Sequence, residues 1–155
     1  MKKVTKGILI ILYTLSVVLM ATMLISVSLQ VISRYIFGNP FTWTEELARY
    51  SFVWVTFIGM TIGVKKGSHI ALDVLQRVLK GRSKFILQLI NYGLLILFSI
   101  ALMISGWHLY ELGLRQTSPS LTLPMNLVYS IIPLSGLLMI YFVITELFSK
   151  KEQKG

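Results

Sequence analysis

Four long apolar runs, whose cores contain no Lys, Arg, Asp or Glu, dominate the hydrophobic pattern of the chain. They cover residues 8–33, 50–64, 85–110 and 124–147. A helix rises 1.5 Å per residue, so about 20 residues are needed to cross a hydrocarbon core of about 30 Å. The second run is too short for this, and we expect its helix to extend back to residue 42. The pattern predicts an all-α fold with one membrane domain over residues 1–155 and spans at 8–33, 42–64, 85–110 and 124–147.

Two of the spans carry residues typical of helix starts and bends. Thr42, with Glu45 three residues later, matches the capping-box pattern, so the second helix is expected to start near Thr42. Pro124 suits the first position of the fourth helix, where no helical donor is needed. Pro133 lies inside that span and is expected to leave the Tyr129 carbonyl without its helical donor and to bend the axis.

A shorter amphipathic segment lies between the second and third spans. Its apolar residues recur at helical spacing, namely Ile70, Ala71, Val74, Leu75, Val78 and Leu79. We predict a short helix over residues 68–80 in the membrane interface, capped by Ser68 and ended by Gly81. A helix packed on nothing in a soluble loop is the weaker alternative, because its apolar stripe would stay in water.

Composition agrees with a membrane protein and narrows the classes of function. Of the 155 residues, 55% are hydrophobic and only 14% are charged, which lies outside the usage of soluble domains. The net charge of +9 would favour nucleic-acid binding in a soluble protein, but here the basic residues flank the apolar runs. We therefore expect the lipid bilayer, and no nucleic acid, as a partner. The absence of cysteine excludes disulfides and thiolate-bound metals.

The distribution of basic residues predicts the orientation in the membrane. The two termini and the connection between spans two and three hold twelve Lys and Arg, and the other two connections with their adjoining helix ends hold three. The positive-inside rule then places both termini and the amphipathic helix in the cytoplasm. The first run is longer than the apolar core of a signal peptide and lacks a small-residue cleavage site, so we interpret it as a retained anchor.

Residues suited to catalysis or cofactor binding are sparse. His69 and His108 fall at opposite ends of the predicted bundle and cannot bind one haem or metal together. The sequence contains none of the common nucleophile, zinc or phosphate-binding motifs, so we expect no catalytic residue, no cofactor and no enzyme activity. For His108 an interfacial position is favoured over a catalytic one. A small self-assembling transporter or channel is the alternative function, but it would need charge deep in the membrane, and the span cores have none.

Two features instead point to packing against other helices. Gly59 and Gly63 form a G-x-x-x-G step on the second span, which allows close helix approach. The end of the first span and the start of the second carry a charged set, Arg34, Glu45, Glu46 and Arg49. This corner is either a solvated loop or a surface that faces a partner. Glu45 and Arg49 are spaced to pair along the helix, and we predict that Arg34 pairs with Glu45 or Glu46.

These motifs, in this order, resemble the small membrane subunit of tripartite ATP-independent periplasmic (TRAP) transporters, the DctQ-like family. That family has an R-Y or R-F pair, a loop with N-P, a W-x-E-E-x-x-R-Y motif and a basic H-I-x-x-D segment. The matching residues are Arg34-Tyr35, Asn39-Pro40, Trp43, Glu45-Glu46, Arg49-Tyr50, His69-Ile70 and Asp73. The last span, with Pro124 and Pro133, is also similar to that of the family.

The resemblance implies a role that the spacing of residues does not show. The chain would be a non-catalytic, multi-pass subunit of the bacterial inner membrane that scaffolds a large multi-spanning permease subunit. A periplasmic substrate-binding protein would deliver an organic acid, such as sialic acid or a C4-dicarboxylate, and the sodium gradient would drive uptake. The resemblance leaves the substrate open. The residues expected at subunit interfaces or in the architecture are Arg34, Trp43, Glu45, Glu46, Arg49, Gly59, Gly63, His69, Asp73 and Pro133.

Overall fold

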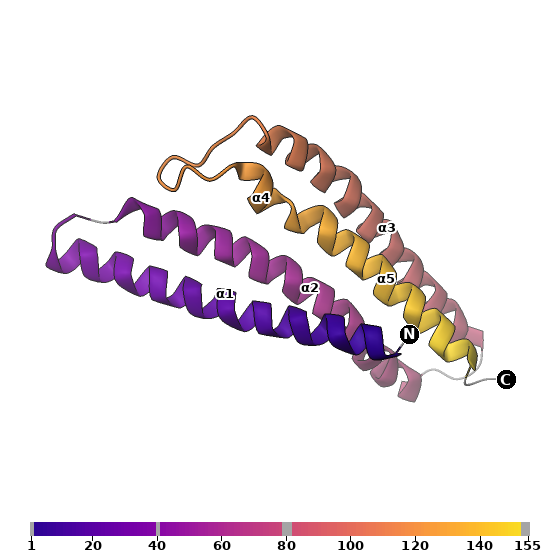
Figure 1. Ribbon diagram of the computed structural model, residues 1–155. Coiled ribbons are helices and arrows are strands. Elements are labelled where there is room, and N and C mark those ends of the chain that lie inside the picture. The colour runs from indigo at the N-terminus through magenta and orange to yellow at the C-terminus, as the bar shows by residue number, and fades with distance from the viewer. Residues whose placement is uncertain (1, 40, 79–81, 153–155) are drawn as a thin grey trace.

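The computed structural model describes the backbone of residues 2–39, 41–78 and 82–152, and the side chains of 3–39, 41–66 and 86–147. Within these ranges the chain is helical, with short connections (Figure 1). The helices are α1 (Lys2–Ile36), α2 (Thr42–Val78), α3 (Arg82–Gly113), α4 (Met125–Tyr129) and α5 (Ile131–Glu152). Four helical stretches are long and apolar enough to cross a membrane: Lys3–Ile36, Thr42–Lys66, Ile86–Gly113 and Met125–Leu147. Within the described residues, the predicted all-α fold with four helices able to span a membrane is confirmed.

The helices form two hairpins. Helix α1 packs along α2, and α3 packs along α5, while the two hairpins meet mainly through α2 and α5. In Figure 1 the hairpins lie together where α1 begins and α5 ends, and they diverge toward the α1–α2 and α3–α4 loops. We call these two ends of the molecule the terminal end and the loop end.

The fourth span consists of two helices rather than one. Pro133 has no N–H to donate to the Tyr129 carbonyl, and the helix is interrupted at Ser130, the residue after Tyr129. The backbone ladder resumes at once, since the Leu134 N–H donates to the Ser130 carbonyl at 3.3 Å. Pro124 is the N-cap of α4, the residue before the first helical residue. The sequence had predicted Pro124 at the first helical position itself.

The second span and the predicted interfacial helix share one continuous backbone helix. Helix α2 starts at Thr42, where the sequence predicted it, but continues without interruption through Ser68 to Val78. The separate start at Ser68 is therefore wrong. Gly67 is the only helix-weakening residue at that point, and one interior glycine costs only about 1 kcal/mol. The side chains that would form the apolar stripe, with His69 and Asp73, lie outside the described side chains, and residues 79–81 lie outside the described backbone, so their place at a membrane surface stays a prediction.

The buried core is small and lies where α1, α2 and the fourth span meet. Its main cluster contains Leu12, Ile58, Ile131, Ile132 and Phe142. Of the span window in α4 and α5, 44% is buried, against 6% in α1. The fourth span is thus the centre of the bundle, and α1 lies at its periphery.

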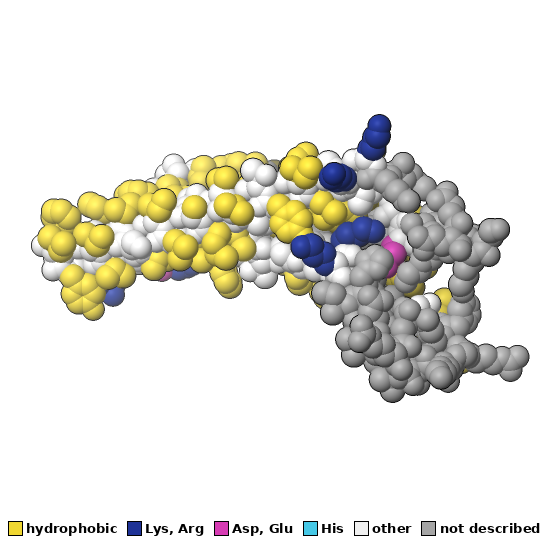
Figure 2. Space-filling model, turned by 90° about the horizontal axis from the view of Figure 1, so that it is seen from below, with side chains coloured by type: hydrophobic (Ala, Val, Ile, Leu, Met, Phe, Trp, Pro, Cys, Tyr) yellow, Lys and Arg dark blue, Asp and Glu magenta, His cyan; other side chains and the backbone are white. Residues whose placement is uncertain are grey.

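Most of the exterior is apolar. Figure 2 shows hydrophobic side chains spread along the described part of one face, with Lys and Arg gathered toward the terminal end. The described lysines at that end are Lys3, Lys6, Lys65 and Lys66. Helices satisfy their own backbone groups, so an apolar helical exterior suits contact with lipid or with other membrane helices.

Candidate functional site

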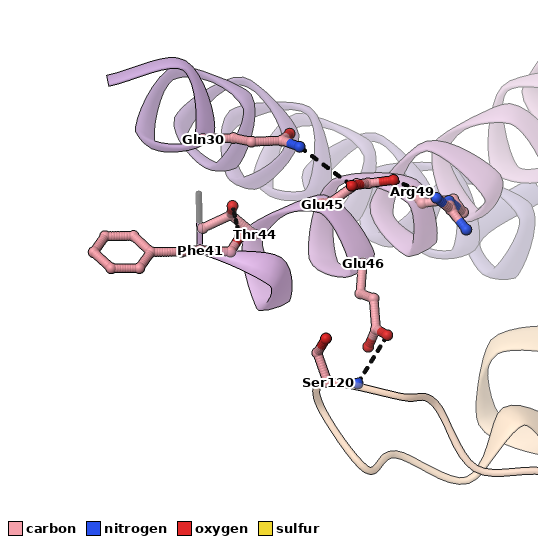
Figure 3. A network of polar contacts seen from close by, with 7 residues as sticks. All are labelled: Gln30, Phe41, Thr44, Glu45, Glu46, Arg49 and Ser120. Atoms are coloured by element: carbon pink, nitrogen blue, oxygen red, sulfur yellow. Dashed lines mark hydrogen bonds and ion pairs between the residues drawn. The ribbon is translucent and has the colours of Figure 1, made fainter. Parts of the chain in front are cut away.

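Glu46 ties the α3–α4 loop to the start of α2. Its carboxylate accepts hydrogen bonds from the backbone N–H groups of Ser120 at 2.9 Å and Leu121 at 3.0 Å, and the first of these is drawn in Figure 3. The residue is buried, with 8% of its surface exposed. Hydrogen bonds to an ionised acceptor are stronger than neutral ones. Glu46 therefore fixes this loop, which lies some 75 residues away in sequence, against the first hairpin.

The α3–α4 loop is folded on itself so that these two N–H groups point outward to Glu46. The Ser118 N–H donates to the Leu123 carbonyl at 2.9 Å, and the Leu123 N–H donates to the Ser118 hydroxyl at 3.2 Å. Thr122 adopts φ of 51°, a left-handed conformation that non-glycine residues rarely use. Such strain is maintained where surrounding contacts fix the backbone, as the bonds to Glu46 and Ser118 do here.

Glu45 faces the other way and links α2 to α1. Arg49 Nη2 donates to Glu45 Oε1 at 2.6 Å, and Gln30 Nε2 from α1 donates to Glu45 Oε2 at 3.4 Å (Figure 3). The i, i+4 spacing had indicated the Arg49 pair. Both side chains are more than half exposed, so this is a surface ion pair of small energetic value in water.

The structure does not pair Arg34 with either glutamate. Among the described residues the ion pairs are Arg49–Glu45 and Lys65–Glu146, and Arg34 takes part in neither. Gln30, one helical turn before Arg34, makes the contact to Glu45 instead. Successive helical residues point about 100° apart, so Glu46 is turned from α1 to the α3–α4 loop and lies away from Arg34.

The hydrogen bonds at the start of α2 differ from those of the predicted capping box. Thr44 Oγ1 donates to the Phe41 carbonyl at 2.6 Å, and the Phe41 N–H donates to Ser33 Oγ of α1 at 3.3 Å. Glu45 is engaged with Arg49 and Gln30. Trp43 is exposed and its ring stacks on Phe41 with centroids 6.4 Å apart. An exposed tryptophan at the end of a span is typical of a membrane interface.

Among the described residues, the G-x-x-x-G step makes no close contact with another helix of this chain. Gly59 and Gly63 are exposed, and a Cβ atom built on either would meet nothing within 4 Å. The close approaches occur elsewhere, because a Cβ on Gly106 would lie 2.7 Å from Pro133 and one on Gly136 2.7 Å from the Ser99 carbonyl. The sequence reasoning missed these positions.

A buried acid at the terminal end joins three helices. Glu146 of α5 is 3% exposed, accepts a hydrogen bond from Tyr92 of α3 at 3.1 Å, and lies 3.9 Å from Lys65 Nζ of α2. A carboxylate in a membrane protein interior is costly unless it is paired. The pattern of the sequence does not single out Glu146, because its partners are distant in sequence.

The geometry offers little for chemistry on a substrate. Among the described residues, no group of three or more His, Cys, Asp or Glu lies close enough to hold a metal ion. His108 is exposed on α3, and the side chain of His69 is outside the described part. Within that part, the two buried acids, Glu46 and Glu146, are both engaged by other groups of the chain. The polar groups of the molecule thus connect helices and loops.

Comparisons with known proteins identify the family. The family model described as "Tripartite ATP-independent periplasmic transporters, DctQ component" matches residues 23–152. A TRAP transporter small permease protein of Haemophilus influenzae is 30% identical over 135 residues, which are 87% of this chain and 84% of the relative. The C4-dicarboxylate TRAP transporter small permease protein DctQ of Rhodobacter capsulatus is 37% identical over 106 residues, 67% of this chain and 47% of the relative. The chain thus spans about half of that second relative's length.

A third relative is a longer protein. The sialic acid TRAP transporter permease protein SiaT of Haemophilus influenzae is 38% identical over 50 residues, which are 32% of this chain and 8% of the relative. The family match and the Haemophilus small permease confirm the resemblance seen in the sequence. With its four apolar spans, the chain therefore belongs to the DctQ component family of the tripartite ATP-independent periplasmic transporters and is a multi-pass protein of the bacterial inner membrane.

Proposed function

We propose that this chain is the non-catalytic small subunit of a sodium-driven, binding-protein-dependent transporter, and that it scaffolds and anchors a large permease subunit. One observation carries the proposal: within the described part, both buried acids are engaged, while long apolar helix faces are left exposed. Such a molecule is suited to packing in the membrane rather than to binding a polar substrate.

The large permease subunit is supported as a partner by the sialic acid permease relative. A segment similar to this chain makes up only 8% of that protein, so in it the segment is joined to a much longer polypeptide. Two sequences that are fused in one protein and separate in another often act together. In this chain, the exposed Gly59 and Gly63 provide a face on α2 where a helix of the large subunit can approach closely.

The loop end is the proposed meeting point for the periplasmic substrate-binding protein. The distribution of basic residues puts the terminal end in the cytoplasm, so the loop end would face the periplasm. There Glu46 holds the α3–α4 loop in one conformation, and Arg34, Trp43 and the Glu45–Arg49 pair are exposed. A fixed, polar surface is suited to repeated docking by a soluble protein.

The substrate is proposed as an organic acid, such as sialic acid or a C4-dicarboxylate. This rests on the names of relatives, one a C4-dicarboxylate and one a sialic acid transporter protein. The small subunit itself would not select between them.

Reconstitution into vesicles tests the scaffold role. The large permease and the binding protein should take up radiolabelled substrate under an inward sodium gradient only when this chain is present. The chain alone should give no flux. Flux through the chain alone would favour the self-assembling transporter or channel, and full uptake without the chain would contradict the scaffold role.

A further inference from the structure

A cleft of about 660 Å³ opens between the two hairpins at the loop end. Its wall on α2 includes Arg49, Val53 and Phe57, and the opposite wall comes from the α3–α4 loop and the fourth span, including Gln116, Thr117 and Ile132. The hairpins diverge here, and the loop held by Glu46 spans the gap between them (Figures 1 and 3).

The lining of the cleft changes from polar to apolar along the helices. Arg49, Gln116 and Thr117 lie at the loop end, whereas Phe57 and Ile132 lie deeper in the spans. From Arg49 to Phe57 the cleft follows α2 for eight residues, or about 12 Å. A polar opening above an apolar interior matches a molecule with a charged head and a hydrocarbon tail.

The volume of the space excludes a helix inside it. A helix with its side chains is about 10–12 Å wide, so about 12 Å of it would take up roughly 1,000 Å³. The cleft holds about 660 Å³, which is too little for a helix but enough for the much thinner hydrocarbon chain.

Arg49 supplies a charged group at the opening. A guanidinium has five N–H donors, and the ion pair with Glu45 uses Nη2. Arginine matches the oxygen spacing of a phosphate and binds it with two parallel hydrogen bonds.

We propose that this cleft holds one glycerophospholipid of the leaflet at the loop end, with an acyl chain along Val53, Phe57 and Ile132 and its phosphate at Arg49. The lipid would fill the space between the hairpins and support their separation. This site is independent of the scaffold role, because it concerns the contacts within this chain.

Lipid retention tests the proposal. The chain is extracted from membranes with the partners that copurify, exchanged extensively into detergent, and its phospholipid is quantified by mass spectrometry. Wild type should retain about one phospholipid per chain. Val53→Trp, which fills the cleft, should lower this at least fivefold, and Arg49→Gln about threefold or more. Phe52→Trp and Arg34→Gln, at exposed neighbouring positions outside the cleft, should retain lipid as wild type does.

A second measurement keeps the test valid if Val53→Trp does not fold. Delipidated wild type is titrated with phospholipid in mixed micelles and, separately, with inorganic phosphate. Saturable binding of one phospholipid that Arg49→Gln weakens would support the site. Equal binding of inorganic phosphate would mean an anion site without an acyl chain, and equal lipid retention by Val53→Trp and Phe52→Trp would mean ordinary surrounding lipid. Either result overturns the proposal.

Discussion

Glu45 and Glu46 are adjacent in sequence, but the structure gives them different tasks. Glu45 is exposed and pairs with Arg49 on its own helix, whereas Glu46 is buried and accepts two backbone N–H groups from a distant loop. Loss of a buried acceptor leaves its donors without a partner, while an exposed ion pair is replaced by water at little cost.

We predict that Glu46→Gln destabilises the α3–α4 loop. The amide has one acceptor oxygen and places N–H donors against the loop N–H groups, so at least one bond is lost. Hydrogen exchange of residues 118–123 should become at least tenfold faster, and the melting temperature in detergent should fall. The matched control is Glu45→Gln, for which both effects should be less than half as large. Equal effects would show that the Glu46 contacts do not hold the loop.

The sequence could predict local partners at this corner but not distant ones. The Glu45–Arg49 pair follows from the i, i+4 spacing, which fixes two side chains on one helix face. The proposed Arg34 contact was wrong. It depends on the register of α1 against the first turn of α2, and in the structure Gln30, not Arg34, contacts Glu45. The partners of Glu46 and Glu146 lie 54 to 81 positions away in sequence, and a single sequence contains no signal for such contacts.

At the scale of the helices, small residues determine which faces pack. Among the described side chains of α3, residues 86–113, the buried positions recur every seven residues, at Tyr92, Ser99, Gly106 and Gly113. Seven residues are almost two helical turns, so these four form one stripe, which packs on α4 and α5. The G-x-x-x-G motif of the sequence indicated Gly59 and Gly63 instead, and these positions are exposed in this chain.

We predict that Gly106→Ala destabilises the chain by about 1–3 kcal/mol, a typical cost of overpacking. The new Cβ would lie 2.7 Å from Pro133, whose ring is rigid, so α3 and α5 must separate. Reversible unfolding in mixed micelles measures the change. Gly59→Ala is the control, since its Cβ meets no atom within 4 Å, and it should be neutral or slightly stabilising. A neutral Gly106→Ala would contradict the close packing of α3 on α5.

The membrane-spanning stretches were predictable because the membrane sets their minimum length, whereas the ends and the continuity of the helices were less so. The spans follow from the lengths of the apolar runs, and the interruption near Ser130 follows from Pro133. A change from a membrane-spanning pattern to an amphipathic one at residue 68 suggested two helices. The backbone remains helical through that change, because a helix does not need to end where its surroundings change.

For the whole assembly, the exposed face of α2 gives a test of the proposed partner contact. Gly59→Leu with Gly63→Leu should leave the isolated chain as stable as wild type, since both positions are open. If the large permease packs on this face, the bulky side chains should lower the yield of the complex at least fivefold in copurification. Gly93→Leu on α3, also open within the chain, should leave the yield unchanged. Normal yield for the double variant would exclude this face as the contact.

The orientation of the whole molecule is the last prediction, and the absence of cysteine makes it simple to test. The two termini and the connection between the second and third spans hold twelve basic residues, and the other two connections with their adjoining helix ends hold three, so we expect the loop end outside. Asn39→Cys should react with a membrane-impermeant maleimide in intact cells, whereas Lys3→Cys should react only after lysis. In the α3–α4 loop the cysteine is introduced at Pro119, because that residue is exposed. Ser118 is unsuitable, since it is 2% exposed and its hydroxyl accepts the Leu123 N–H. Labelling of Lys3→Cys from outside would reverse the topology and would move the loop end, with its lipid cleft, to the cytoplasmic leaflet.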